Sequence, residues 1–524
     1  MSIAGRTQPV RRFVRAKRRW LAGLGFVLLA GVMIAIWLVG RNWPFRYRII
    51  HPELESVFGS QVQIAHYART YFPNPGFVAT GLTLSRNSDA KSPIGTVQQL
   101  AVQGHWLDLF TLNRRLQLVQ MKGVHITLPA PGSKPAQQQF PSGSSGDFMG
   151  PSIPVQTLEI TNSVLEIQRI HGGSFKFPVT ELHIENLERG RAITFAVDMR
   201  NPIPKGHIRA SGKFGPLNAK NLGATPLSGE YRFTEVRLTG IGELHGEVSA
   251  YGRFHGTMGA IETEASVNTP DFAVSDGRPI PFNGRLQCTV NGLNGDVHYQ
   301  SMEARSGQTL ITASGSTTGG EKTTHLWIQI ARGRAEDILK PFLHKEPPIA
   351  GPVALHAAAT LGPQSQGSFL QRLVVEGGFD APADKLTNAS EQLTLSAFSS
   401  RARDLDLPDP KAHPDKAYET PQVFSSLQGP ATIRKGVVTS RHLVFRVPGA
   451  EARLHGTYSF GSEAVHLTGH LRMQSDVSHT VSGFKAVLLK PLAPFFHHKH
   501  AGADIPIVIT GKPGDYKISQ NIFH

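Results

Sequence analysis

Residues 248–254, Val248-Ser-Ala-Tyr-Gly-Arg-Phe254, show the pattern that decides the fold of this 524-residue chain. Val248, Ala250, Gly252 and Phe254 fall two positions apart, and the residues between them are mostly polar. Since successive side chains of a β-strand point to opposite faces, a period of two places these four residues on one face. The pattern is typical of an antiparallel sheet with one dry and one wet face.

The same pattern recurs along the chain, with a glycine as the third alternating residue. The further copies are Ile208, Ala210, Gly212 and Phe214; Ile280, Phe282, Gly284 and Leu286; Leu373, Val375, Gly377 and Phe379; Ala452, Leu454, Gly456 and Tyr458; and Val465, Leu467, Gly469 and Leu471. The gaps between copies are irregular, which argues against a solenoid of fixed period. Glycine inside a strand permits bending or close approach of backbones. The sequence therefore predicts a mainly β protein with an elongated, curved, mostly antiparallel, groove-like sheet and a few short helices.

Residues 20–40, WLAGLGFVLLAGVMIAIWLVG, carry no charge and are long enough for a helix that spans a bilayer. The residues expected to hold it in the membrane are Trp20, Leu21, Phe26, Leu29, Ile34, Trp37 and Leu38. Trp43 follows closely, and tryptophans prefer the membrane interface. A cleaved signal peptide is the alternative, but its apolar region would be shorter, and no A-x-A-like site follows.

Basic residues precede this segment and set its expected orientation. They include Arg11, Arg12, Arg15, Lys17, Arg18 and Arg19. The positive-inside rule places the N-terminus in the cytoplasm and the rest of the chain on the other side of the membrane. Ten Lys and Arg residues lie in residues 1–48, which hold no Asp or Glu, so most of the net charge of +15 belongs to this end. The charge therefore indicates anionic lipid headgroups and not nucleic acid.

Composition divides the chain into seven segments. These are a basic tail (1–19), a transmembrane helix (20–40), an N-terminal β region (41–128), a flexible Pro/Gly/Ser-rich linker (129–154), a β-rich groove region (155–400), a polar, Pro-rich insert (401–421) and a C-terminal β region (422–524).

Residues that could carry chemistry are few. Cys288 lies in an alternating run and is expected to be a buried structural cysteine. The histidines of His497-His-Lys-His500 have no cluster of carboxylates close by, and Asp404, Asp406 and Asp409 lack the offsets of a calcium-binding loop. No phosphate-binding, dinucleotide-binding, serine-hydrolase or zinc-protease motif is present. The sequence therefore predicts no catalytic residue, no cofactor and no metal site.

The order of several short motifs resembles that of the AsmA family of bacterial envelope proteins. The motifs are Tyr71-Phe-Pro-Asn-Pro-Gly76, Gly81-Leu-Thr-Leu84, Leu118-Val-Gln-Met-Lys-Gly-Val124, Gly429-Pro-Ala-Thr-Ile433 and Ile505-Pro-Ile-Val-Ile-Thr-Gly511. The resemblance implies a single-pass inner-membrane protein with a periplasmic β-groove, which binds or conducts phospholipid. It also implies a contribution to outer-membrane homeostasis, partners among outer-membrane or periplasmic proteins, and no enzymatic activity.

A sheet that is dry on one face must be covered, be closed, or hold something apolar. The residues expected to line that face are Phe214, Phe254, Leu286, Ile311, Phe379, Leu454 and Leu471. About 25–30 strands at about 4.8 Å spacing would give a groove on the order of 120–145 Å long. Two alternatives stay open: a filled core, which favours a scaffold for outer-membrane protein assembly, and a β-rich enzyme acting on polysaccharide through paired carboxylates.

Overall fold

The computed structural model describes residues 33, 43–58, 60–85, 94–109, 115–129, 153–168, 173–188, 190–218, 221–363, 367–403, 423–474, 504–512 and 515–520. The predicted membrane helix (except Met33), the basic tail, nearly all of the linker and of the polar insert, and the 497–500 histidines lie outside these residues. In the described part of the chain, no helix is both long enough and apolar enough to cross a membrane.

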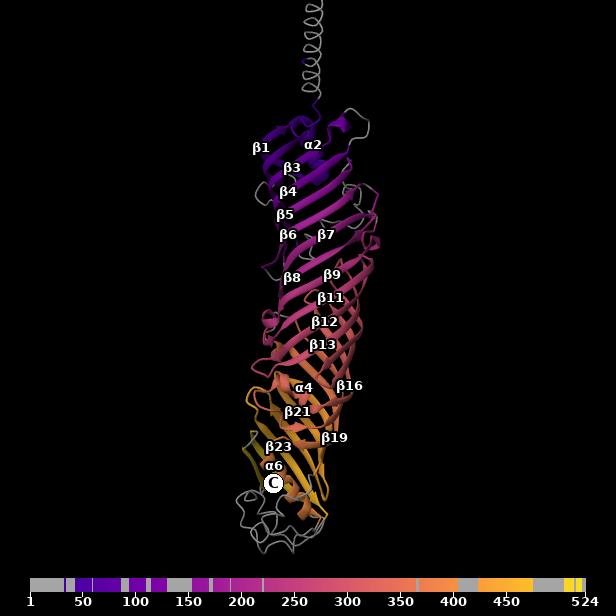
Figure 1. The fold of residues 1–524 in the computed structure, drawn as a ribbon. Helices are drawn as coiled ribbons and strands as arrows, with labels where there is room; N and C mark the ends of the chain where they lie inside the picture. Colours follow the sequence, from indigo (N-terminus) through magenta and orange to yellow (C-terminus); the bar gives the residue numbers. More distant parts are fainter. Residues whose placement is uncertain are drawn as a thin grey trace, which may run out of the picture.

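The described residues form one long sheet whose strands follow one another in chain order along the molecule (Figure 1). The strands of the N-terminal segment are β1 (Gln61–Thr70), β2 (Gly76–Ser85), β3 (Gly95–Gly104), β4 (Leu116–Leu128), β5 (Val155–Gln168) and β6 (Ser174–Leu187). Those of the central segment are β7 (Ile193–Pro202), β8 (Lys205–Phe214), β9 (Pro226–Arg237), β10 (Leu244–His245), β11 (Glu247–Thr257), β12 (Ala260–Val274), β13 (Ile280–Val290), β14 (Val297–Ser306), β15 (Thr309–Thr318) and β16 (Thr323–Arg334). Those of the C-terminal segment are β17 (Ile349–Ala350), β18 (Pro352–Leu361), β19 (Leu373–Leu386), β20 (Ser425–Arg434), β21 (Val437–Val447), β22 (Ala450–Ser459), β23 (Val465–Met473), β24 (Asp504–Lys512) and β25 (Asp515–Gln520).

Consecutive strands pair antiparallel almost throughout, as the alternating pattern predicted. The two-residue strands are side pairings: β10 adds to β12, and β17 adds to β19, so β9 pairs with β11 and β16 pairs with β18. The expectation of a mainly β protein with one long, mostly antiparallel sheet and few short helices is confirmed. The twenty-three strands in line would extend about 105 Å at about 4.8 Å each if the sheet were straight.

The pair β4–β5 is the parallel exception, with Leu116 opposite Val155 and Leu128 opposite Ile167. Parallel neighbours require a crossover connection, because the chain must return to the starting end of the first strand. Residues 129–154, the predicted linker, form this connection, and the sheet continues without a break across it.

The few helices of the described residues are short. They are α2 (Tyr47–Phe58), α4 (Ala335–Leu339), α5 (Phe369–Arg372) and α6 (Ala389–Ala402), with 3-10 turns η1 (Trp106–Leu109), η2 (Leu222–Ala224), η3 (Leu238–Ile241) and η4 (Lys340–Phe342). Two of them, α2 and α6, lie at opposite ends of the molecule (Figure 1). Each is part of an apolar core.

The N-terminal core lies between α2 and strands β1 to β5. Ile50, Leu54 and Phe58 of α2, spaced four residues apart on one helix face, pack against buried residues such as Leu82 and Leu100. Trp43 is 0% exposed, so this residue is not the interfacial anchor that the sequence suggested. Its ring lies 4.6 Å from that of Tyr71 and 5.8 Å from that of Trp106, and these neighbours provide the apolar surroundings that the sequence had assigned to lipid.

The C-terminal core lies between α6 and strands β19 to β24. Phe398 and Ala402 of α6 pack with buried side chains that include Leu443, Leu454 and Leu471. The helix is also fixed to the sheet by polar groups, since Gln392 Nε2 donates to Val423 O at 2.7 Å and Ser399 Oγ donates to Pro448 O at 2.7 Å. A third, smaller cluster joins Ala335 of α4 to Val353 and Ala381.

Candidate functional site

The register aligns the predicted apolar residues on one face of the whole sheet, here called the apolar face. In the central segment Gly212 of β8 is opposite Gly229, and Gly229 is opposite Phe254. Two residues from Phe254 on the same face, Gly252 is opposite Ala265, which is opposite Leu286. Directly opposed residues in an antiparallel pair point to the same side. Phe214, Phe254, Leu286, Ile311 and Phe379 all lie on this face, and each of them is half-buried.

Leu454 and Leu471 lie on the same face but in a different setting. They are 5% and 7% exposed, and both belong to the core beneath α6. Phe379 packs against the margin of that core. The structure therefore brings all seven predicted residues onto one face. Four lie in the uncovered central segment, two are covered by α6, and Phe379 lies between these groups at the margin of the core.

The central segment contributes no member to the three apolar cores of the described residues. Its apolar face is instead composed of side chains that are mostly half-buried, with single buried residues such as Val236 and Ile280 near the strand ends. No charged side chain occupies an inward position of β7 to β16. This stretch is therefore an apolar surface that neither a helix nor a second sheet of the described part seals.

Hydroxyl groups on the central face pair with one another. Tyr231 Oη lies 3.3 Å from Thr263 Oγ1, and burial raises the pKa of Tyr231 above its ordinary value. Tyr299 Oη lies 3.1 Å from Thr317 Oγ1, which in turn lies 2.9 Å from Thr324 Oγ1. Because these polar atoms already have partners, an apolar ligand can lie over them at little desolvation cost.

Aromatic rings lie over glycines at the centre of this face. Gly229 is opposite Phe254, and Gly252 is opposite Tyr231. A Cβ atom added at Gly229 would lie 2.7 Å from Phe254 Cζ, and one at Gly252 would lie 2.6 Å from Tyr231 Cζ. The two rings, with centroids 6.4 Å apart, therefore occupy the space that side chains at the glycines would fill.

The recurrent motif glycines bring neighbouring backbones close together. An added Cβ would lie 2.1 Å from Ser228 O at Gly212, 2.2 Å from His356 O at Gly377, and 1.9 Å from Arg453 O at Gly469. These distances leave no room for a side chain. The observed contacts agree with the expectation that the glycines serve close approach in a curved sheet.

The sheet curls until its two margins touch. Leu370 N, in α5 after β18, donates to Glu243 Oε2, in the turn after η3, at 2.9 Å. Further along, the ring of Phe342 stacks on that of Phe460 at 5.4 Å, and His344 N donates to Glu463 Oε1 at 3.1 Å. In Figure 1 the strands around β12 and β13 cross in front of strands behind them. The apolar face therefore lines the inside of the curl, and the charged face lies outside.

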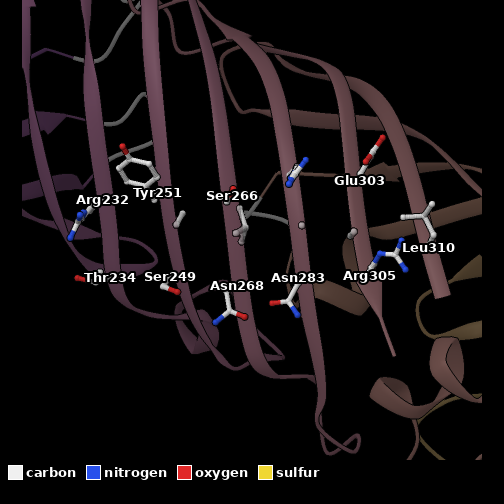
Figure 2. A pocket seen from close by; sticks show the side chains of 15 residues that line it. Arg232, Thr234, Ser249, Tyr251, Ser266, Asn268, Asn283, Glu303, Arg305 and Leu310 are labelled. Atoms are coloured by element: carbon white, nitrogen blue, oxygen red, sulfur yellow. The ribbon is translucent and has the colours of Figure 1, made fainter. Parts of the chain in front are cut away.

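A hollow of about 890 Å³ lies on the opposite, polar face of the central strands (Figure 2). Its lining includes Arg232, Arg285 and Arg305, with Asn268 and Asn283 between them. Figure 2 shows Arg232, Asn268, Asn283 and Arg305 spread across adjacent strands of the sheet. Charged and amide groups of this kind would exclude an acyl chain, so the hollow is not part of the apolar surface.

The sequence did not identify β9 as part of this site. Leu227, Tyr231 and Phe233 alternate along β9, and they lie on the apolar face opposite Phe214, Gly252 and Ala250. The signal was present as Leu227-x-Gly229-x-Tyr231-x-Phe233, with the glycine in second place and not in third. A search for alternation alone would have found it.

Among the described residues, no three His, Cys, Asp or Glu side chains lie close enough together to hold a metal ion. Cys288 is buried, and burial raises the pKa of its thiol, which keeps the sulfur protonated. No protein-family model, curated protein or solved structure matches the chain.

Proposed function

We propose that this chain is a membrane-anchored, non-enzymatic protein of the AsmA type that holds phospholipid acyl chains along the apolar face of its central segment. The observation that supports the proposal best is the uncovered, uncharged and half-buried inner face of β7 to β16. Each acyl CH₂ buried there would contribute about 0.8 kcal/mol. The headgroup would stay at the margin of the curl, where charged residues begin.

The proposed location is the inner membrane of a bacterium, with residues 20–40 as the single span and the sheet in the periplasm. The apolar, uncharged composition of 20–40 and the basic residues before it support this topology. A periplasmic sheet of this length would shield lipid tails over a large part of the distance to the outer membrane. We place its contribution in lipid transport and outer-membrane homeostasis.

The test is photo-crosslinking in the full-length protein, which leaves the anchor in place. A benzophenone amino acid replaces Phe254 on the apolar face, and in the control it replaces Tyr251, 39% exposed on the polar face of the same strand. Irradiation of cells should give a phospholipid adduct at position 254, detected by mass spectrometry, and none at 251. Absence of an adduct at 254, with parallel substitutions at Phe214 and Leu286 also negative, would overturn the proposal.

One observation favours a second function, that of a scaffold in outer-membrane protein assembly. The C-terminal part of the same face is filled by α6 and forms a closed core. If the apolar face of the central segment were also covered in the cell, no lipid adduct would form at position 254. Protein adducts would form instead at positions on the polar face, such as 251. The crosslinking experiment therefore distinguishes the two functions.

A further inference from the structure

The N-terminal end of the molecule exposes large apolar side chains at one margin. Phe72, in the turn between β1 and β2, is 89% exposed, which is the highest value among the large apolar residues of the described chain. Leu107, in η1 between β3 and β4, is 68% exposed, and Tyr71 is 45% exposed. Because β1–β2 and β3–β4 turn at the same margin of the sheet, these residues form one surface, here called the tip.

Hydrogen bonds and aromatic packing fix the two turns of the tip to each other. Trp106 Nε1 donates to Pro73 O at 2.9 Å, and Gly104 N donates to Pro75 O at 2.7 Å, so the two turns are joined. The ring of the fully buried Trp43 packs between Tyr71 and Trp106. Local packing thus buries Trp43 behind the tip and leaves Phe72 and Leu107 exposed. Exposed apolar groups on a rigid platform indicate an interaction surface.

The position of the chain identifies what this surface contacts. Trp43, behind the tip, is three residues from Gly40, where the uncharged segment 20–40 ends. Three residues can span at most about 10 Å. If residues 20–40 cross the bilayer, Trp43 lies within about that distance of the end of the span, and the tip lies beside Trp43.

Charge at the same end fits a lipid surface. Arg48 in α2, Arg69 at the end of β1 and Arg115 immediately before β4 are all exposed. Basic residues near a membrane are attracted to anionic headgroups, and apolar side chains beside them enter the interfacial layer.

We propose that Phe72 and Leu107 insert into the interfacial layer of the bilayer that holds the anchor, so that the sheet stands on the membrane through a second contact. This inference rests on the membrane-anchored function proposed above. It adds a membrane-docking site formed by the folded part of the protein. With two contacts, the orientation of the sheet relative to the membrane is fixed, which a connection of three residues alone would not achieve.

The test measures the depth of spin labels in the full-length protein in nanodiscs containing anionic phospholipid. Phe72→Cys and Leu107→Cys each receive a nitroxide, and Leu293→Cys, a 49% exposed position in the turn between β13 and β14, is the control. The native Cys288 is buried, so unmodified protein treated in the same way provides the blank. Labels at 72 and 107 should be at least about tenfold more accessible to oxygen, relative to a water-soluble nickel complex, than the label at 293.

Equal nickel accessibility at all three positions would overturn the docking proposal. Phospholipid crosslinked at position 254 is measured separately, so the two proposals fail independently. A tip in water together with lipid at 254 removes only the docking site, whereas a tip in the bilayer without lipid at 254 removes only the lipid-binding function. A double variant, Phe72→Asp with Leu107→Asp and a label at Tyr71→Cys, should move that label into the nickel-accessible range; an unchanged label would also contradict docking.

Discussion

The central and C-terminal segments share one sequence pattern, but they differ in what covers it. Phe254 and Leu286 in the centre and Leu454 and Leu471 near the C-terminus occupy equivalent inward positions of glycine-containing strands. The first pair is half-buried, whereas the second pair is almost fully buried beneath α6. Alternation therefore specifies which side of a strand is dry, and a separate element decides whether that side is core or an available surface.

The largest expected effect comes from truncating an inward side chain in each segment. Leu454→Ala should lower the free energy of unfolding of the C-terminal segment by about 3 kcal/mol, since it leaves a cavity in a sealed core. Leu286→Ala, at a half-buried position, should cost only about 1 kcal/mol.

Hydrogen exchange of the β22 and β13 amides in the full-length protein measures these two losses locally. Equal losses would remove the distinction, because they would mean that the central face is packed as tightly as the C-terminal core.

The second effect concerns the close approach of strands within the covered segment. Gly469 lies opposite Leu454, and an added Cβ would come within 1.9 Å of Arg453 O. Gly469→Ala should therefore force β22 and β23 apart and cost about 2 kcal/mol. Gly461→Ala, in the turn of the same hairpin where no atom lies within 4 Å of an added Cβ, is the control.

Exchange of the β22–β23 amides reports the separation directly. If the β22–β23 amides are as well protected in Gly469→Ala as in the Gly461→Ala control, the close approach of the two backbones is not needed for the curvature of the sheet.

The third effect tests the cover itself. Gln392 of α6 is 6% exposed, and its side chain accepts from Leu386 N at 2.7 Å and donates to Val423 O at 2.7 Å. Gln392→Ala leaves two buried backbone groups without partners, which should cost about 1–2 kcal/mol and loosen α6. The neighbouring Leu393 is 55% exposed, so Leu393→Ala should have almost no effect.

Photo-crosslinking from position 454 gives the sharper measurement. Lipid adducts should form there in Gln392→Ala and not in Leu393→Ala, because loss of the cover converts core into accessible apolar surface. If no lipid crosslinks at position 454 in Gln392→Ala although α6 is loosened, the curved sheet itself excludes lipid from the C-terminal core.

The sequence predicted the sheet and its dry side because period-two alternation is a local property of each strand. It identified Phe254 for that reason, and it could also have identified Tyr231. It did not predict α6, since the buried face of this helix consists largely of small or polar residues such as Gln392, Ser396 and Ser399. Their hydrogen-bond partners come from distant parts of the chain, and a local pattern carries no information about them. For the same reason Leu454 was not distinguished from Phe254.

The last expected effect is a pH dependence at the boundary between the two segments. Asp384 of β19 is 1% exposed, and neither of its carboxylate oxygens has a hydrogen-bond partner in the described structure. Burial and the nearby Glu336 carboxylate raise the pKa of Asp384 to about 6 from its usual value of 3.8. Between these two values the folded state binds more protons than the unfolded state, so stability falls as pH rises through this window and levels off above about pH 6.

Asp384→Asn replaces the charge with a neutral amide of the same shape and should remove this fall, leaving the variant more stable than the native protein by up to about 3 kcal/mol at pH 7.5 and similar to it at pH 4. Hydrogen exchange of β19 at the two pH values measures the difference. Asp380→Asn, at an exposed position of the same strand, is the matched control. If the native protein protects the β19 amides equally at both pH values, Asp384 is neutral throughout this range or its charge is compensated. In that case a buried charge does not destabilise the boundary between the central and C-terminal segments.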